Sequence, residues 1–489
     1  MAATAQQGVA AGAARRPRGR AALVLAICCC SIFIVGLDTS ALNVALPSIQ
    51  RDLHASIQGA QWTLASYMLA LASFLIVSAS IGDRMGRRRV FQVGLVVFAI
   101  GSLLCALAPS LGWLIAFRVL QGLGGSMLNP VALSIISNTF TERRARARAI
   151  GFWGSTVGLS IAAGPILGGA LVQAFTWRAI FLINVPIALT AMVLAGRYIR
   201  ESMAATRRRF DPVGQALLVV TVGSLAFGII EVPMEGWTSP VIIGCFVATV
   251  AGLLGFVWWE RHHSEPLIDL RFFRSPPFAG ATAIALLAFT AQGGFLLLNT
   301  FYLQDVLDFS PVEAGLAILP MAALLAVTSP ISGRVVARWG PRPSLAIGGS
   351  SVFVAGLITV IPRDDPHYAR LFVMYALIGF GLGWINAAIT NTAVAGMPNR
   401  QAGVAAGIAS TMRQLGQSLG VAIIGSIIAG QVVDVVAQTP AFMRAYHASW
   451  AVIGAIGLAN LIIGLATTSR RAMRSAELNT DRMGAAARD

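Results

Sequence analysis

A single carboxylate stands in the middle of the first long apolar stretch of the chain. Asp38 belongs to the motif LDTSALNVALP, residues 37–47, whose other members suit a helix buried in lipid. An ionised acid near the centre of a bilayer costs about 3 kcal/mol, so such residues usually face a cavity or a partner and serve a function. Burial favours the neutral form of a carboxylic acid. We therefore predict that Asp38 binds and releases a proton; the alternative is a structural acid that is permanently paired with a donor.

A buried arginine is the second residue that could take part in this chemistry. Arg118 lies within another apolar stretch, where a guanidinium stays charged and must be paired or hydrated. Polar and small residues follow it at helical spacing, namely Gln121, Gly122, Gly125 and Asn129. This face predicts a cavity wall or a close helix contact, and we expect Gln121 and Asn129 to line a substrate cavity.

Three further polar residues are weaker candidates for the lining of that cavity. Asn43 follows Asp38 by five residues, and Asn386 shares a helical face with glycines, a pattern that favours helix packing over binding. Arg413 lies about ten residues into its apolar stretch, so it either needs an anion at hydrocarbon depth or extends to the membrane surface. Asp305 follows an uninterrupted apolar run, and its role stays open between a wetted surface acid and a second deep acid.

The short loop after the second apolar stretch concentrates charge. It contains Asp83, Arg84, Gly86, Arg87 and Arg88. Its acid can cap a helix end or pair with an arginine across a bundle interface, and such a pair can hold one conformation and break in another. The simpler interpretation is topological, since basic loops remain on the cytoplasmic side. We assign these residues to gating and exclude them from substrate contact.

The fifth apolar stretch carries a stripe of small residues. Gly158, Gly164, Pro165, Gly168 and Gly169 lie in GLSIAAGPILGG. Small residues let membrane helices approach closely, and a proline inside a helix bends it. The stripe predicts a tight helix crossing, and packing alone does not determine a direction of transport.

The elements that must position these residues are about fourteen apolar segments of the length that crosses a bilayer. Hydrophobic residues make up 56% of the 489 residues and charged residues 11%, whereas soluble domains carry about 25% charged residues. We predict an all-α polytopic membrane protein with two six-helix bundles and two central linker helices. The predicted parts are a disordered basic cytoplasmic tail (1–20), an N-terminal bundle (21–200), a linker (201–275), a C-terminal bundle (276–468) and a second cytoplasmic tail (469–489).

The net charge of +16 reflects topology. The chain contains no lysine, and most of its 36 arginines lie in loops on one side of the apolar segments. Cytoplasmic loops carry such an excess, so we expect both termini in the cytoplasm and no nucleic-acid partner. Without lysine the chain cannot form the phosphate-binding loop of ATP-driven pumps. The five cysteines and five histidines lack metal-ligand spacing, so we expect no metal, no cofactor and no enzymatic activity.

A faint internal repeat and several motifs resemble a known family. The motif ASIGDRMGRR (79–88) aligns with GRVVARWGPR (333–342), which is typical of two six-helix repeats with a substrate site between them. The first copy resembles the loop signature of the major facilitator superfamily, apart from Ala79, where that signature usually has Gly. The motifs LDTSALNVALP, LIAFRVLQGLGGS (114–126) and GLSIAAGPILGG resemble those of its proton-driven drug exporters. The motif TWRAIFLINVP (176–186) and the fourteen segments point to the fourteen-helix drug:proton antiporter branch.

The resemblance implies a monomeric antiporter of the bacterial cytoplasmic membrane that exports amphipathic drugs or antibiotics by alternating access. The proton gradient would drive it, so the expected partners are protons, a small amphipathic substrate and the lipid bilayer. The resemblance also implies that Arg118 acts in proton transfer and that residues 158–169 mark exporters. Three alternatives stay open: an uptake symporter for a small metabolite, an exporter of an endogenous natural product, and a scaffold or sensor that transports nothing.

Overall fold

Every regular element that the structure describes is helical. The computed structural model describes residues 18–203, 211–263, 266–359, 368–394, 402–431 and 439–475. Within these ranges the chain forms α-helices, one short 3-10 helix and one π-helical turn, and no strand. The predicted all-α class is confirmed. Most of the two predicted tails lies outside the described residues.

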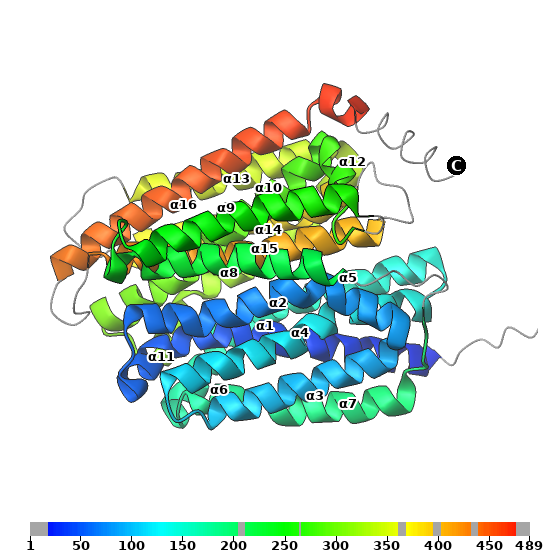
Figure 1. The fold of residues 1–489 in the computed structure, drawn as a ribbon, viewed down its shortest axis with the longest axis horizontal. Coiled ribbons are helices and arrows are strands. Elements are labelled where there is room, and N and C mark those ends of the chain that lie inside the picture. The colour runs from blue at the N-terminus through cyan, green and yellow to red at the C-terminus, as the bar shows by residue number, and fades with distance from the viewer. Residues whose placement is uncertain are drawn as a thin grey trace, which may run out of the picture.

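Seven helices form the N-terminal half of the molecule (Figure 1). They are α1 (Arg18–Leu53), α2 (Ile57–Met85), α3 (Arg87–Ala106), α4 (Leu111–Thr139), α5 (Arg143–Ala174), α6 (Arg178–Leu182) and α7 (Asn184–Tyr198). The last two follow one another so closely that they make one span. Local signals set the helix ends: Ser56 caps α2 by accepting a hydrogen bond from Gly59 N (3.2 Å), and Gly86 ends it with a φ of 108°.

Two helices connect this half to the next. They are α8 (Pro212–Glu235) and α9 (Pro240–His262), and each begins with a proline at its first position, where the missing N–H has no helical partner anyway. The two helices pack against each other, and α8 also contacts α2 and α15 (Ala402–Ala429). A short 3-10 helix, η2 (Leu270–Arg274), leads into the C-terminal half.

The C-terminal half consists of the remaining helices. They are α10 (Pro276–Phe301) with its π-helical extension η3 (Tyr302–Val306), α11 (Pro311–Ala317), α12 (Leu319–Trp339), α13 (Pro341–Ile358), α14 (Tyr368–Val394), α15 and α16 (Thr439–Thr467). Ser310 and Glu313 form a reciprocal capping box at the start of α11. Here the closest packing joins α10 to α15, α12 to α14 and α13 to α16.

The helices are long enough for a membrane. Within the described residues, twelve segments have the length and hydropathy to span a bilayer. Helices α13 and α15 pack among them and bring the arrangement to the predicted number of about fourteen. Helix α1 begins and helix α16 ends at the same end of the bundle (Figure 1), as an even number of spans requires.

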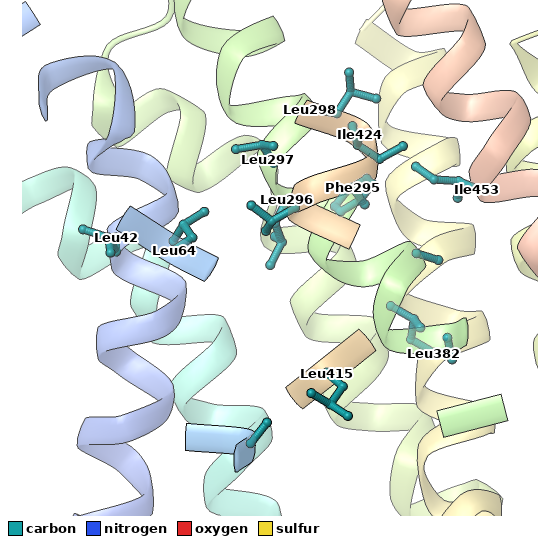
Figure 2. Packing of buried hydrophobic residues seen from close by; sticks show 14 of the residues in the cluster. Leu42, Leu64, Phe295, Leu296, Leu297, Leu298, Leu382, Leu415, Ile424 and Ile453 are labelled. Atoms are coloured by element: carbon teal, nitrogen blue, oxygen red, sulfur yellow. The ribbon is translucent and has the colours of Figure 1, made fainter. Parts of the chain in front are cut away.

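The two halves meet along a buried apolar seam. Figure 2 shows Leu42 and Leu64 of the N-terminal half in the same cluster as Leu296 and Leu297 of α10, and all four side chains are buried. Polar contacts also join the halves: Gln61 Nε2 of α2 donates to the carbonyl oxygens of Val421 (3.4 Å) and Ala422 (3.3 Å) of α15, and Gln304 Nε2 of η3 donates to Val44 O of α1 (2.8 Å). The apolar seam therefore holds the halves together while leaving few polar contacts to break.

Close backbone contact between the halves is found at one end of the molecule. We call the end at which α2 finishes and α3 and α5 begin the basic end, because the ends of these helices carry Arg84, Arg87, Arg88, Arg144, Arg146 and Arg148. Toward that end, Gly151 and Gly154 of α5 and Gly407 of α15 face open space, with no atom within 4 Å of a Cβ placed on them. At the other end, a Cβ on Gly169 of α5 would overlap the backbone of α11 at Pro311. The halves are thus in backbone contact at the far end, whereas these glycines of α5 and α15 have no neighbour toward the basic end.

The glycines of α15 predict a contrast in stability. A Cβ on Gly420 would overlap Thr290 O and lie 2.7 Å from Gly294 N of α10, whereas Gly407 has open space. We expect Gly420→Ala to lower the free energy of unfolding by about 1–3 kcal/mol through overpacking. In the control Gly407→Ala, the higher helix propensity of alanine should leave stability equal or raise it by about 0.5–1 kcal/mol. Thermal unfolding of the purified variants measures both, and equal shifts would contradict this packing.

Candidate functional site

Asp38 lies at the centre of the N-terminal half. Its side chain is fully buried, on the face of α1 that packs against α4 and α7. Its Oδ2 accepts a hydrogen bond from Arg118 Nη1 of α4 at 2.5 Å, and neither side chain has any exposed surface. The sequence placed both residues in apolar stretches but did not show that they touch. The structure brings them together as a direct ion pair.

Two amide side chains complete the surroundings of the Asp38 carboxylate. Its Oδ1 accepts from Gln121 Nε2 (2.8 Å) of α4 and from Asn184 Nδ2 (2.9 Å) at the start of α7. Both amides also donate to Ser102 Oγ of α3 at 3.2 Å. Ser102 in turn donates to the carbonyl of Phe181 (2.8 Å). Four helices therefore meet at one carboxylate, and three donors stabilise its ionised form.

The Arg118 guanidinium has further contacts besides the one to Asp38. Its Nη1 also donates to Gln121 Oε1 (2.6 Å), and its Nε donates to the carbonyl of Thr63 in α2 (3.1 Å). The Tyr67 ring lies 4.1 Å from its Cζ, a distance at which the cation is attracted to the ring face. Its Nη2 has no hydrogen-bond partner. An arginine with one unused donor in a buried site can bind a further acceptor when the arrangement changes.

Glycines bring these helices close enough for the network to form. A Cβ on Gly101 of α3 would lie 2.7 Å from the backbone nitrogen of Gln121, and one on Gly122 of α4 would lie 2.6 Å from Tyr67 O of α2. Any larger side chain at either position would separate the helices. Ser102 and Gln121 are adjacent to these two glycines, so the close approach places their side chains at the carboxylate.

The network is stable only when it is complete. Removing two charges from water costs several kcal/mol per ion, and close pairing with full hydrogen bonding is needed to offset that cost. Breaking one member leaves a buried charge uncompensated, which typically costs about 3–5 kcal/mol. Protonation of Asp38 would remove the negative charge and leave Arg118 without its anion. The site can therefore couple the binding of one proton to a rearrangement of α1 against α4.

Sequence reasoning missed several members of this network. Asn184 lies in TWRAIFLINVP, which was assigned only as a family motif, and Ser102 and Tyr67 were not singled out. The available signal for Asn184 was an amide inside an apolar run, the same criterion that identified Asn43. Asn43 instead donates to Thr39 O of its own helix (2.9 Å), and its Oδ1 has no partner. Its assignment to the substrate cavity remains a prediction.

The polar residues of the C-terminal half form a second, smaller group. Arg413 Nη2 of α15 donates to Thr390 Oγ1 (2.6 Å) and to the carbonyl of Asn386 (3.3 Å), both on α14. Its guanidinium lies 5.6 Å from the Phe289 ring of α10. Among the described residues it has no carboxylate partner. The structure joins Asn386 and Arg413, whereas Asn129 lies on α4, with its Oδ1 unpaired.

The predicted charged loop is helical in the structure: Asp83 and Arg84 belong to the end of α2, Arg87 and Arg88 belong to the start of α3, and Gly86 alone separates the two helices. An acid that the sequence did not identify orders this junction. Asp83 pairs with Arg87 one helical turn away (2.7 Å), within its own half. Glu201 accepts from Arg88 N (2.9 Å) and from Arg89 N (3.2 Å), so it neutralises the start of α3. A Cβ on Gly86 would lie 2.6 Å from Glu201 Cδ, so the glycine leaves the space that this carboxylate occupies. Arg84 Nε is unpaired. The sequence left Asp83 open between capping a helix end and pairing across the halves, and among the described residues its salt bridge is the local one to Arg87. The gating role remains a prediction.

The glycine stripe of α5 faces two partners. A Cβ on Gly164 would overlap Ser40 of α1, and one on Gly168 would lie 2.8 Å from Ala41 Cα. Ser40 Oγ donates to Ser160 O (3.2 Å) across this crossing. The predicted tight helix crossing is therefore the contact between α1, which carries Asp38, and α5. The remaining members of the stripe lie toward the C-terminal half: Gly158 faces Ala326 of α12 at 3.7 Å, and Pro165 and Gly169 pack against α11.

The acid with an open role, Asp305, lies in η3 near the far end. Its side chain is partly buried, and the neighbouring Gln304 Nε2 donates to Val44 O of α1 (2.8 Å), a contact between the halves. No metal-binding group of three or more acids, histidines or cysteines exists among the described residues. The structure therefore offers no alternative to Asp38 as the best-buried paired acid.

Comparison with known proteins gives a consistent result. The family model of the Major Facilitator Superfamily matches residues 28–421. The chain is 38% identical over 398 residues to the multidrug resistance protein Stp of Mycobacterium tuberculosis (strain CDC 1551 / Oshkosh), covering 81% of this chain and 74% of Stp. It is 39% identical over 433 residues to the tetracenomycin C resistance and export protein of Streptomyces glaucescens, covering 88% and 80%.

Solved structures of transporters share the fold. A bacterial homologue of the human lysosomal transporter Spinster matches with a TM-score of 0.63 at 19% identity, covering 95% of this chain and 99% of that one. A POT family transporter matches with a TM-score of 0.67 at 15% identity, covering 93% and 96%. At such low identity these likenesses concern the fold.

The amide of Asn184 provides a test of the Asp38 network. In Asn184→Ala the carboxylate loses one of three donors and Ser102 loses a partner, so the free energy of unfolding should fall by about 1–3 kcal/mol. The matched control is Asn391→Ala on α14, where the exposed amide bonds only to its own helix at Ala387 O (2.8 Å). Thermal unfolding measures the stability of both variants. If Asn184→Ala were as stable as Asn391→Ala, a role for Asn184 at the carboxylate would be contradicted.

Proposed function

The chain belongs to the major facilitator superfamily, and on that premise we propose that it exports amphipathic drugs or antibiotics in exchange for protons. It is a multi-pass membrane transporter rather than an enzyme. The relatives carry names of resistance and export: multidrug resistance, tetracenomycin C resistance and export, and multidrug efflux in LfrA of Mycolicibacterium smegmatis, which is 33% identical. These names support export of small molecules over uptake of a nutrient.

The arginines at the basic end support the proposal that this end of the molecule faces the cytoplasm. Short loops rich in arginine remain in the cytoplasm during insertion. The arginines of the loops after α2, α4 and α9 lie at this end, whereas the opposite loops hold few, among them Arg51 and Arg178. We therefore assign the described conformation to an inward-open state of a monomer in the bacterial cytoplasmic membrane, with both termini in the cytoplasm. Such a state would receive substrate from the inner side.

The buried pair of Asp38 and Arg118 is the observation that carries proton coupling. In the proposed cycle, substrate enters from the cytoplasm and the halves close at the basic end and open at the other. A proton from outside then binds Asp38 and breaks its ion pair, substrate leaves, and the protonated form returns to the inward-open state. Release of the proton to the cytoplasm restores the pair. No cofactor is required, because the proton gradient supplies the energy.

The energy available is sufficient for efflux. One charge moving through 100 mV yields about 2.3 kcal/mol, and each tenfold concentration gradient costs about 1.4 kcal/mol. One proton can therefore maintain a neutral drug at a gradient of roughly fortyfold. A monocation exchanged one for one with a proton gains only from the pH difference.

The C-terminal group of Arg413, Asn386 and Thr390 is the proposed polar part of the substrate cavity. It lies toward the basic end on α14 and α15, and Thr390 is exposed. Together with Asn129 and Asn43 of the other half, these side chains would orient an amphipathic molecule between the bundles. Gln121, which was also predicted to line the cavity, is instead buried at the Asp38 carboxylate. Apolar side chains would contribute most of the contact area, as in most small-molecule sites.

Proton release in inverted vesicles tests the proposed function. With an imposed pH gradient, addition of amphipathic drugs should evoke proton movement in the wild type. We expect Asp38→Asn to reduce this response by about tenfold or more, because the pair acts as one unit with Arg118.

The matched control is Asp52→Asn on the same helix. Asp52 also pairs with an arginine, Arg178 at 2.5 Å, but its side chain is 47% exposed. This variant should retain the drug-evoked response. An undiminished response in Asp38→Asn would overturn the assignment of the proton site, and uptake of a metabolite with no response to any drug would favour a symporter.

A further inference from the structure

A second pair of acids lies outside the Asp38 network, between the linker helices. Asp211 caps the start of α8, and Glu260 lies near the end of α9. Their exposed fractions are 2% and 3%. Neither acid makes a salt bridge among the described residues. Two buried carboxyl groups without a cation require another source of stabilisation.

The unused oxygens of the two acids face the same point. Asp211 Oδ2 and Glu260 Oε1 are both buried without a hydrogen-bond partner. A Cβ on Gly214 would lie 2.6 Å from Glu260 Oε1 and still closer to Asp211 Oδ2, so the two oxygens are within about 5 Å of each other. Gly214 leaves the space that lets them converge. Two acceptors that converge in a buried space, each lacking a donor, are explained by one shared hydrogen.

The remaining hydrogen bonds show which acid would carry that hydrogen. Asp211 Oδ1 accepts from Gly214 N (2.9 Å) and from Trp259 Nε1 (3.0 Å). Glu260 Oε2 accepts from Ile268 N (3.0 Å), and the backbone of Leu267 acts on the same carboxyl group more weakly. A carboxyl group that accepts more hydrogen bonds is stabilised in its ionised form, so the hydrogen is assigned to Glu260 and the negative charge to Asp211.

We propose that Asp211 and Glu260 form a proton-binding site that holds one proton, carried on Glu260 Oε1 and donated to Asp211 Oδ2. The pair is separate from Asp38, and the proposal does not depend on the substrate or direction of transport. The other charged side chain that acts on Glu260 is Asp269, which is itself paired with Arg271 (2.8 Å). A further negative charge nearby also favours retention of the proton.

The site joins the linker to the start of the C-terminal half. Through Ile268 N, Glu260 holds the segment that follows α9, and the buried side chains of Leu267, Ile268 and Phe272 anchor that segment in the main apolar cluster. While the proton is present, the linker helices and this segment form one hydrogen-bonded unit. Loss of the proton at high pH places two like charges together and weakens the unit.

The variant Glu260→Gln tests the site, because an amide can donate permanently to Asp211 Oδ2 and still accept from Ile268 N. We expect the apparent Tm of the full-length protein to match that of Glu260→Gln at about pH 6 and to fall below it by at least ~2 °C at about pH 9. Glu142→Gln, at an exposed acid of the same end, is the control and should follow the wild type at both pH values.

Infrared spectroscopy provides the direct readout. The C=O stretch of a protonated carboxylic acid should be present in the wild type at neutral pH and lost in Glu260→Gln. It should also be lost in Asp211→Asn, where the amide can donate to an ionised Glu260, and this second variant keeps the test valid if the first fails to fold. A band that survives in both variants, or parallel Tm profiles of wild type and Glu260→Gln, would overturn the proposal.

Discussion

The ion pair between Asp38 and Arg118 imposes the main physical constraint on the N-terminal half. Two opposite charges with no exposed surface are tolerated only when nearly every donor and acceptor around them is used. The amides of Gln121 and Asn184 and the hydroxyl of Ser102 meet that requirement, and they come from different helices. The positions of α1, α3, α4 and α7 are therefore tied to the charge state of one carboxylate. Under the proposed mechanism, binding of one proton to this carboxylate would change the packing of these four helices.

Glycine packing determines how such a change can reach the rest of the molecule. The stripe of α5 contacts α1 through Gly164 and Gly168, next to the segment that carries Asp38, and contacts α11 of the other half through Gly169. One helix thus touches both the proton site and the contact between the halves at the far end. A Cβ on Gly164 would overlap the Ser40 side chain, and one on Gly168 or Gly169 would meet backbone atoms, so these crossings leave little room for displacements of α1. Under the proposed mechanism, this arrangement would connect protonation of Asp38 to the opening of the far end.

The sequence was sufficient for the fold and for the two charged residues of the site, because length, hydropathy and the cost of buried charge are local properties. The sequence did not show which residues form hydrogen bonds with these charged groups. Asn184 and Glu201 are ordinary residues in their own segments and acquire their roles only when distant helices meet. Asp83 was expected to have a choice of partners, and the tertiary arrangement selects Arg87 of the same half. The convergence of Asp211 and Glu260 likewise depends on the packing of α8 against α9.

The central claim is that Asp38 and Arg118 act as one unit in proton exchange. A double-mutant cycle of Asp38→Asn and Arg118→Gln, measured as drug-driven proton release in inverted vesicles, tests it most directly. If the pair is the unit, the double variant should lose no more activity than the more severely affected single variant, as for groups that work together. Losses that multiply independently in the double variant would show that the two residues act separately, and would contradict the account.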